Sequence, residues 1–393
     1  MDNPIFCPDD ARHLFVGGTN GAGKTTGLSN FIESGVKKNY GTLIVDGKGD
    51  TGKGSMLEIT TGFCKKHKRP LYVIDMNDPD NSARYNPFMG ATPTVAKDIL
   101  SNLSPDWSEE HYKANFERYT QRVVKLMDIA GIMLSFNSII KYMPVEKLTE
   151  LSAALQHGGL ITKDAHLENL EIIKASGKIA EQAVARFATI AESEVGQIFS
   201  EDGINIYTAL QSGAVILFIL NPLLFPETSA AMGRLVLIDA KQAVSKLFGK
   251  DKRSFFIFDE MGVYASPVLI DLINKSRSAG VTCISATQSL ADLEAASGDV
   301  FLHQIIENCN NYIVLRQNST KSTEGWAETL GTHEKMIMTY KTADNGATGE
   351  GSARKGHEFI IHPNEIKTFK TGEGVFLSRD TGKCERIRIV KPF

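Results

Sequence analysis

Apolar positions in the first 75 residues fall into short runs separated by stretches with helical periodicity. Residues 13–16, 42–45 and 71–74 are almost wholly apolar or β-branched, which is typical of strands buried on both faces of a sheet. A glycine-rich turn follows the first run, and a helix is predicted from about Lys24. Strands that alternate with helices predict βαβ units and a parallel sheet.

The pattern changes between residues 92 and 199, where apolar residues recur every three or four positions and strand signals almost disappear. The simplest interpretation is an all-α domain at 92–199, inserted into an α/β domain formed by residues 1–91 and 200–393. A helical elaboration of the same core is the alternative, and the sequence leaves it open. One such apolar series consists of Tyr112, Phe116, Tyr119, Val123 and Met127.

The α/β pattern resumes after residue 200 and continues to the end of the chain. A helix is predicted near 229–246, and Asp380-Thr381-Gly382 separates two apolar runs as a hairpin turn does. The Gly/Ser/Ala-rich residues 346–356 predict a mobile surface loop. Strands are predicted at residues 214–220, 255–258, 281–286, 312–315, 374–377 and 386–390.

Composition narrows the class of protein only slightly. The chain has 393 residues, 42% hydrophobic and 23% charged, with a formal net charge of −3, as in an ordinary soluble globular protein. The net charge argues against a surface coated in basic side chains, although a ring can confine positive potential to a channel. The five cysteines are scattered and include no CxxC pair, so neither a zinc site nor a disulfide framework is expected. No segment predicts a membrane span or a signal peptide, and the expected location is the cytoplasm.

A phosphate-binding loop lies between the first predicted strand and the helix that follows it. The segment fits the pattern G-x-x-x-x-G-K-[ST], in which backbone N–H groups and the helix N-terminus cradle phosphate oxygens. Lys24 is expected to reach the β- and γ-phosphates of ATP, and Thr25 to offer its hydroxyl to Mg²⁺. The nucleotide-binding residues predicted here are Gly18, Thr19, Asn20, Gly21, Ala22, Gly23, Lys24, Thr25 and Thr26.

An acid pair ends the apolar run 255–258. Asp259 and Glu260 are therefore predicted at the carboxyl edge of a buried strand, where sheets of this kind bind ligands. Asp259 is expected to hold Mg²⁺ through water, and Glu260 to orient and deprotonate the attacking water. Together with the phosphate-binding loop, this pair predicts a RecA-like P-loop ATPase with a central, mostly parallel sheet and at least one strand between the two motifs.

Two further residues are candidates for catalytic roles. Gln288 ends the next predicted strand, where it can contact the γ-phosphate or, alternatively, cap the following helix. Arg277 follows the acid pair by fewer than twenty residues and can act on the site of a neighbouring subunit, as arginine fingers do. A solvated arginine at a helix end is the competing interpretation. Asp46 and Lys48 follow the second strand and are assigned supporting roles.

These motifs together resemble the type IV secretion coupling proteins, the TraD/TraG-like family within the FtsK/HerA group of DNA-pumping ATPases. The chain departs from the family pattern at Gly47, which stands where proline is usual, and at Asp50, which stands where glutamate is usual. The segments that carry the resemblance are residues 46–50, 72–75, 85–88, 258–262, 277–281, 287–293, 308–311 and 326–331.

The resemblance implies an ATP-driven DNA translocase and substrate receptor that works as a hexameric ring. Its expected partners are DNA, bound largely without regard to sequence, together with relaxosome or effector proteins and components of the secretion channel. Family members usually carry an N-terminal membrane anchor, so the expected place is the cytoplasmic face of the inner membrane, through an anchor outside this chain or a partner. Two alternatives stay open: the assembly and export ATPase of the same secretion systems, and a nucleotide-gated docking module that does not pump DNA.

Overall fold

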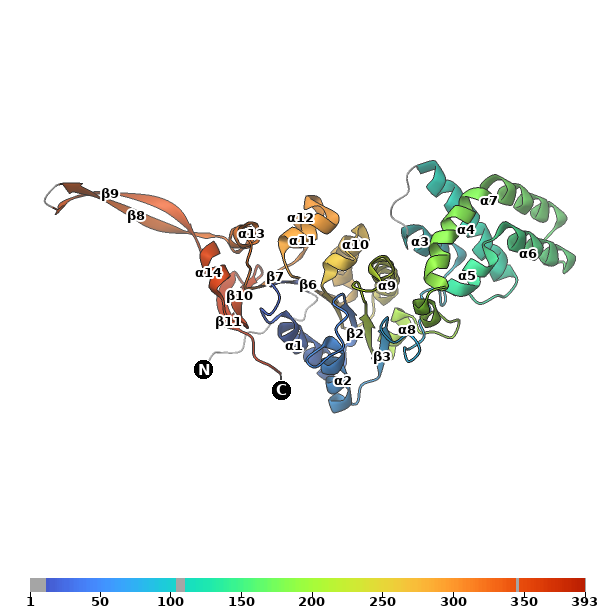
Figure 1. Cartoon of the computed structure of the whole chain (residues 1–393), viewed down its shortest axis with the longest axis horizontal. Coiled ribbons are helices and arrows are strands. Elements are labelled where there is room, and N and C mark those ends of the chain that lie inside the picture. The colour runs from blue at the N-terminus through green and yellow to red at the C-terminus, as the bar shows by residue number, and fades with distance from the viewer. Residues whose placement is uncertain (1–11, 104–109, 344–345, 393) are drawn as a thin grey trace.

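A computed structural model describes residues 12–103, 110–343 and 346–392, and its centre is a nine-stranded sheet. The strand order is β11-β10-β7-β1-β6-β5-β2-β4-β3 (Figure 1). All neighbours from β7 to β3 pair in parallel, and β10 and β11 extend the sheet in antiparallel pairing. The strands are β1 (Leu14–Gly17), β2 (Gly41–Asp46), β3 (Leu71–Asp75), β4 (Val215–Ile219), β5 (Ser254–Asp259), β6 (Val281–Thr287), β7 (Asn311–Leu315), β10 (Glu373–Ser378) and β11 (Lys383–Arg388).

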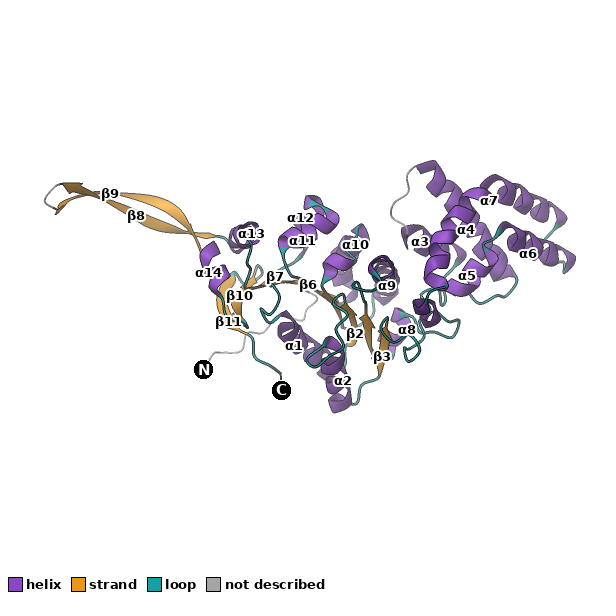
Figure 2. Cartoon of the chain, viewed as in Figure 1, coloured by secondary structure: helices purple, strands orange, loops and turns teal. Residues whose placement is uncertain are grey.

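Alternate side chains of the central strands enter two separate cores, as the strand period of two requires. On one face, Leu14 and Val16 pack with apolar residues of α1 (Lys24–Lys37) and α2 (Met56–His67). On the other face, Phe256 and Phe258 pack with α9 (Pro226–Leu247) and α10 (Pro267–Ser276). The helices therefore form layers on both sides of the sheet (Figure 2), and the continuous apolar runs are strands buried on both faces.

Smaller helices complete this part of the molecule. The second face also carries α11 (Leu290–Ser297), α12 (Asp299–Asn308) and α13 (Thr320–Leu330). The remaining short helices are α8 (Ile206–Gln211), α14 (Pro363–Thr368) and the 3₁₀ turns η2 (Met261–Val263) and η3 (Arg277–Ala279). No helix among the described residues is both long and apolar enough to cross a membrane.

The chain between β3 and α8 forms helices that lie at one end of the molecule (Figure 1). Their shared core contains Phe116, Tyr119 and Val123, which repeat at helical spacing along α4. The predicted division at residues 92 and 199 stays a prediction, although all of these elements fall between those positions. They are α3 (Pro93–Leu103), α4 (Glu110–Ile129), α5 (Phe136–Tyr142), α6 (Val145–His157), α7 (Lys163–Ala191) and η1 (Glu194–Ile198).

The prediction of a surface loop at residues 346–356 is wrong. These residues form most of β9 (Gly346–Phe359), which pairs antiparallel with β8 (Thr332–Ala343) in a hairpin that projects from the body (Figure 1). Glycine is depleted in strands, and so to a lesser degree are alanine and lysine, when residues are considered one at a time. Here their backbone groups pair with those of a more apolar strand that precedes them, and composition within 346–356 alone does not show that partner.

Trp326 of α13 packs directly beneath the end of β1. Its indole is fully buried, and a Cβ atom built on Gly17 would lie 2.3 Å from an indole carbon. Glycine at position 17 therefore makes room for the ring just before the phosphate-binding loop begins. The indole Nε1 is one of the buried polar atoms of the described chain that have no hydrogen-bond partner.

Candidate functional site: a P-loop nucleotide site

The phosphate-binding loop lies between the end of β1 and the first turn of α1, as the sequence predicts. Gly21 and Gly23 have φ values of 70° and 106°, in the left-handed region that favours glycine. Lys24, Thr25 and Thr26 form the first turn of α1, where backbone N–H groups have no partner within the helix. Among the described residues, no backbone carbonyl accepts a hydrogen bond from the amide of Gly21 or of Gly23 either. These free amides can donate to phosphate oxygens, so the loop is suited to bind phosphate.

The loop is fixed from outside by the segment that leads into β10. The hydroxyl of Thr371 donates to the carbonyl of Gly21 at 2.9 Å, and the amide of Gly372 donates to the carbonyl of Ala22 at 2.9 Å. A Cβ atom on Gly23 would lie 3.2 Å from the amide nitrogen of Gly372. These contacts hold the loop in one shape without occupying the amides of its glycines.

Lys24 lies against the acid pair as well as the loop. Its ammonium donates to the carbonyl of Gly18 at 2.6 Å, and its side chain is almost buried. Burial lowers the pKa of Lys24, and the negative charges of Glu260 and Asp259 oppose that shift. The lysine predicted to bind phosphate and the two predicted carboxylates therefore form one electrostatic cluster.

Asp259 is the last residue of β5 and is buried. Burial raises its pKa, and the charge of Lys24 opposes this. Across the β2–β5 pair its register partner is Asp46, also buried, whose pKa is raised to about 7 by burial and then by the charge of Asp259. Two carboxylates that both resist ionisation favour a bound cation between them and the phosphates.

Glu260 adopts left-handed backbone angles, φ 49° and ψ 48°. A residue with a Cβ atom pays roughly 1–2 kcal/mol for this conformation. The conformation depends on Gly47, because a Cβ atom there would lie 2.7 Å from the Glu260 carbonyl oxygen. Burial raises the pKa of Glu260, while the charge of Lys24 and a hydrogen bond with the side chain of Gln288 lower it. A raised pKa brings a carboxylate closer to the range that suits a general base.

The structure thus brings Lys24, Asp259, Glu260 and Gln288 together at the carboxyl edge of three adjacent strands, β1, β6 and β5. The predicted strand between the two motifs is β6, and this prediction is confirmed. Thr25 lies in the first turn of α1, next to Lys24. No cluster of three or more His, Cys, Asp or Glu within the described ranges could hold a metal ion by itself. The predicted magnesium ligands, Thr25 and Asp259, would therefore act together with the phosphates of the nucleotide, which is a usual arrangement for Mg²⁺.

Arg277 does not join this cluster. It lies one residue beyond α10, opens η3, and is exposed near the start of β6, at the amino edge of the sheet. Its electrostatic neighbour is His13, just before β1, whose pKa is lowered to about 4 by burial and further by the charge of Arg277. The length of β1 separates these two residues from the phosphate-binding loop of the same chain.

The sequence reasoning missed two residues that touch the site. Arg316 follows β7 beside the phosphate-binding loop, and its carbonyl accepts a hydrogen bond from the amide of Thr19 at 2.9 Å. Tyr264 lies behind the acid pair, with its hydroxyl 3.1 Å from the carbonyl of Asp259. A signal existed for Arg316, because a basic residue directly after a buried parallel strand lies at the ligand-binding edge. Nothing in the sequence marks Tyr264.

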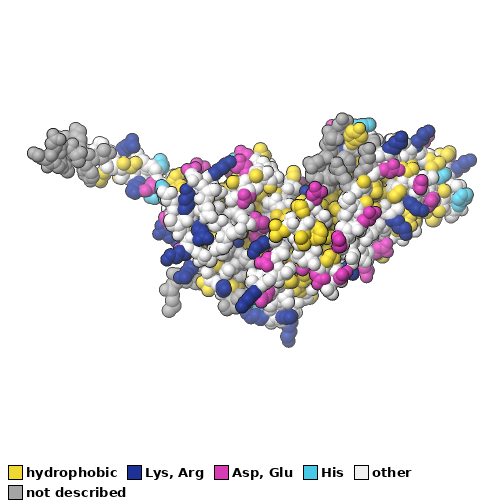
Figure 3. Space-filling model, viewed as in Figure 1, with side chains coloured by type: hydrophobic (Ala, Val, Ile, Leu, Met, Phe, Trp, Pro, Cys, Tyr) yellow, Lys and Arg dark blue, Asp and Glu magenta, His cyan; other side chains and the backbone are white. Residues whose placement is uncertain are grey.

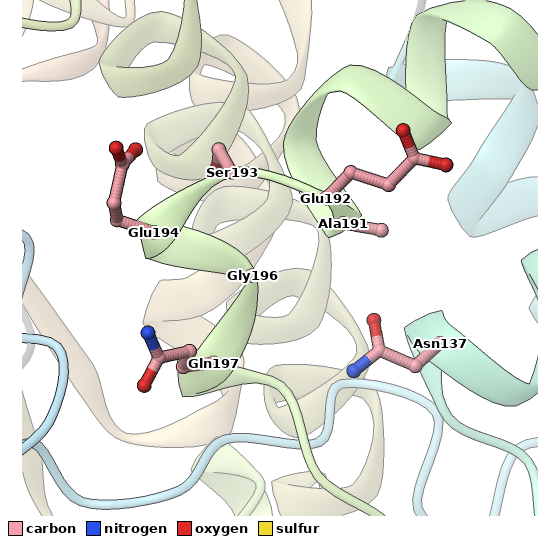
Figure 4. Close-up of a pocket in the computed structure, with 7 residues that line it drawn as sticks. All are labelled: Asn137, Ala191, Glu192, Ser193, Glu194, Gly196 and Gln197. Carbon is pink, nitrogen blue, oxygen red and sulfur yellow. The ribbon is translucent and has the colours of Figure 1, made fainter.

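An open pocket elsewhere on the molecule is a poor candidate for nucleotide. It lies where α7 passes into η1, and Figure 4 shows Glu192 and Asn137 on one side of that turn and Glu194 and Gln197 on the other. Two glutamates and no lysine or arginine line it, so it would repel phosphate. The lining residues are Asn137, Ala191, Glu192, Ser193, Glu194, Gly196 and Gln197.

One family model matches the part of the chain that contains the acid pair. Residues 253–371, from the start of β5 to the loop that contacts Gly21, match the family model described as the TraM recognition site of TraD and TraG. The resemblance to the TraD/TraG-like coupling proteins is confirmed. An uncharacterised protein of Mycoplasma pneumoniae is 32% identical over 101 residues, which is 25% of this chain and 67% of that protein.

Solved structures match over nearly the whole chain. The bacterial conjugative coupling protein TrwBdeltaN70 has a TM-score of 0.71 at 15% identity, covering 98% of this chain and 86% of its own. TrwB in complex with ADP and Mg²⁺ has a TM-score of 0.67 at 15% identity, with 98% and 86% coverage. VirB4 of Thermoanaerobacter pseudethanolicus has a TM-score of 0.59 at 13% identity, with 98% and 91% coverage. These likenesses confirm the predicted RecA-like α/β fold with a mostly parallel sheet and a helical part.

Proposed function

We propose that this chain is the ATP-driven DNA translocase and substrate receptor of a conjugation or type IV secretion system. The observation that carries the proposal is the cluster of Lys24, Asp259 and Glu260, joined by Gln288, within a chain whose residues 253–371 match the TraD/TraG family. The cluster supplies the groups for ATP hydrolysis. The family match supports the role of substrate receptor and favours it over the assembly and export ATPase.

In this mechanism ATP is the substrate and Mg²⁺ its counter-ion. The amides of the glycine-rich loop and the ammonium of Lys24 bind the phosphates, and Thr25 and Asp259 hold the metal. When bound there, Mg²⁺ would supply positive charge beside the phosphate oxygens. Glu260 orients a water molecule and accepts its proton, which is worth roughly 10²–10⁴ in rate. Gln288, hydrogen-bonded to Glu260, is placed to respond when the γ-phosphate is lost.

The position of Arg277 supports a ring. An arginine at the amino edge is remote from the phosphates of its own chain, so it acts only if a neighbouring copy presents its site to that edge. We propose a hexamer in which Arg277 stabilises charge on the neighbour's transferring phosphoryl group, an effect of roughly 10³–10⁵ in rate where such fingers are known. We expect the hexamer to lie at the cytoplasmic face of the inner membrane.

DNA is the proposed polymer substrate, with relaxosome or effector proteins and channel components as protein partners. Figure 3 shows lysine and arginine side chains gathered over β10, β11 and α14 at one end of the molecule. On β11 the exposed basic residues are Lys383, Arg386 and Arg388. Lysine and arginine on an edge strand also prevent sheet-to-sheet aggregation, and the salt dependence of DNA binding distinguishes the two roles.

The decisive experiment measures ATP turnover against protein concentration, with and without single- or double-stranded DNA. A translocase shows turnover that rises steeply as rings assemble and rises again with DNA, and Glu260→Gln abolishes both increases. A rate of ATP turnover that does not change with DNA but changes with a protein partner supports the docking module. Turnover stimulated only by channel components supports the export ATPase. Either of the last two outcomes would overturn the translocase.

A further inference from the structure

Tyr264 lies directly behind the acid pair, at the end of the η2 turn. The side chain is fully buried, and its hydroxyl lies 3.1 Å from the carbonyl oxygen of Asp259 and 3.3 Å from that of Val45. The hydroxyl therefore joins the carboxyl ends of β5 and β2. Burial, together with the charges of Asp259, Asp46 and Glu260, raises the pKa of the phenol well above its usual value, so the group stays a hydrogen-bond donor.

The carbonyl of Asp259 belongs to the peptide unit that joins Asp259 to Glu260. That oxygen accepts from the hydroxyl of Tyr264 and from the amide of Gly47, each at 3.1 Å. Because the peptide unit is planar, fixing its oxygen also fixes the orientation of the amide of Glu260. Two donors thus fix the orientation of the peptide plane just before Glu260. Glu260 itself has left-handed backbone angles, which a residue with a Cβ atom keeps only when its surroundings impose them.

The ring of Tyr264 is held in turn by α9. A Cβ atom on Gly233 would lie 2.4 Å from the Cβ of Tyr264 and 2.7 Å from Cγ of its ring, so only glycine leaves room for the tyrosine there. Further along α9, Asp239 accepts a hydrogen bond from the hydroxyl of Tyr85 at 3.0 Å. Tyr85 lies where the chain leaves β3 toward the helices, so α9 touches both the base of the site and the stem of the helical part.

We propose that Tyr264 is a positioning residue for Glu260, holding the backbone of the general base in its left-handed conformation through the carbonyl of Asp259. This inference rests on the proposed function, since it presumes that Glu260 activates water. A tyrosine that serves only the core would stabilise the fold without affecting the base. The two roles differ in what happens when the hydroxyl alone is removed.

The test uses Tyr264→Phe, which keeps the ring against Gly233 and removes the hydroxyl. We expect kcat for ATP hydrolysis to fall roughly tenfold while the dissociation constant for ATP, measured by calorimetry, stays within about twofold. In the Glu260→Gln background the same substitution should have almost no further effect, because the group it positions is already gone. An unchanged kcat in Tyr264→Phe, or an equal fall in both backgrounds, would overturn the proposal.

Tyr312→Phe is the matched control. Tyr312 is also buried, its hydroxyl lies 2.6 Å from the carbonyl of Ile306 and 2.8 Å from that of Cys309, and it lies outside the site. The Tyr312→Phe variant should have a lower free energy of unfolding than the parent protein and the same kcat for ATP hydrolysis. If Tyr264→Phe does not fold, Gly233→Ala supplies the test, since its methyl group displaces the Tyr264 ring while every residue of the site keeps its identity. A kcat equal to that of the parent protein would then overturn the proposal. A parent protein without ATPase activity, or a Glu260→Gln variant as active as the parent, would instead refute the proposed function.

Discussion

Asp46 and Asp259 lie opposite each other at the carboxyl ends of β2 and β5, and both side chains are buried. Each is the last residue of its strand, and each has a raised pKa because burial disfavours its charged form. The charge of Asp259 adds to the shift of Asp46. In the absence of nucleotide the fold therefore tolerates two carboxylates that would be ionised in water.

The free energy of unfolding of the protein without nucleotide should fall as pH rises, because of the raised pKa of Asp46. Its pKa is about 7 in the fold against an ordinary value of 3.8, so across that interval the folded state holds a proton that the unfolded state has lost. Asp46→Asn, whose amide oxygen can still accept from the amide of Lys48, should remove this dependence. Relative to the parent, the variant should gain about 3 kcal/mol in its free energy of unfolding between pH 5 and pH 8. Denaturant titrations at the two pH values measure this, and an equal difference at both would exclude Asp46 as the cause.

Lys24→Ala and Glu260→Gln should separate binding from hydrolysis. Lys24 contacts phosphates in the ground state, so its loss should abolish nucleotide binding. Glu260 acts on water in the transition state, so Glu260→Gln should bind ATP normally and reduce kcat by roughly 10²–10⁴. Calorimetry and single-turnover hydrolysis measure the two quantities. Unchanged ATP affinity in Lys24→Ala would refute the assignment of the phosphate-binding loop.

Arg277 should act between subunits. Arg277→Ala is expected to bind ATP normally and hydrolyse it poorly, and Lys24→Ala not to bind it. Mixing the two variants should restore part of the activity, because an interface that combines an intact phosphate-binding loop with an intact Arg277 can then form. Ring assembly is checked by sedimentation. A mixture that assembles yet is no more active than the two variants measured separately would leave Arg277 as an exposed charge beside His13.

DNA binding should depend steeply on salt and weakly on sequence. Contacts to phosphates release counter-ions, so the logarithm of affinity falls linearly with the logarithm of salt concentration. If Lys383 and Arg388 of β11 each contact one phosphate, replacing both with glutamate should reduce the slope by about 1.4–1.8. Lys65→Glu with Lys66→Glu on α2 makes the same change in charge and serves as the control. Equal loss of slope in both double variants would show a general effect of charge and no contact at β11.

Most of the sheet could be predicted because its strands are buried on both faces. Runs such as residues 255–258 contain only apolar residues, and burial on two faces produces that pattern whatever the surrounding helices do. The phosphate-binding loop and the acid pair could be predicted because each occupies a fixed place relative to its own strand. For the same reason it could be predicted that Lys24 and Glu260 lie at the same edge of the sheet.

The remaining features depend on contacts between segments far apart in the chain. β9 is a strand because β8 pairs with it, and its own glycines and serines give no sign of this. The role of Tyr264 depends on the carbonyl of Asp259 and on the gap at Gly233. The distance of Arg277 from the phosphates depends on where α10 ends. None of these relationships has a local periodicity, so a pattern read along the chain cannot reveal them.

The packing of Trp326 beneath Gly17 gives this protein an intrinsic optical probe of nucleotide binding. The chain has two tryptophans, and this indole touches the residue that leads into the phosphate-binding loop. Indole emission responds to nearby dipoles and charges, and this ring is fully buried with no hydrogen-bond partner for its N–H group among the described residues. A Trp107→Phe variant would leave Trp326 as the single tryptophan. With excitation at wavelengths that only indole absorbs, quenching or a spectral shift upon addition of ATP would then follow occupancy in real time without any dye.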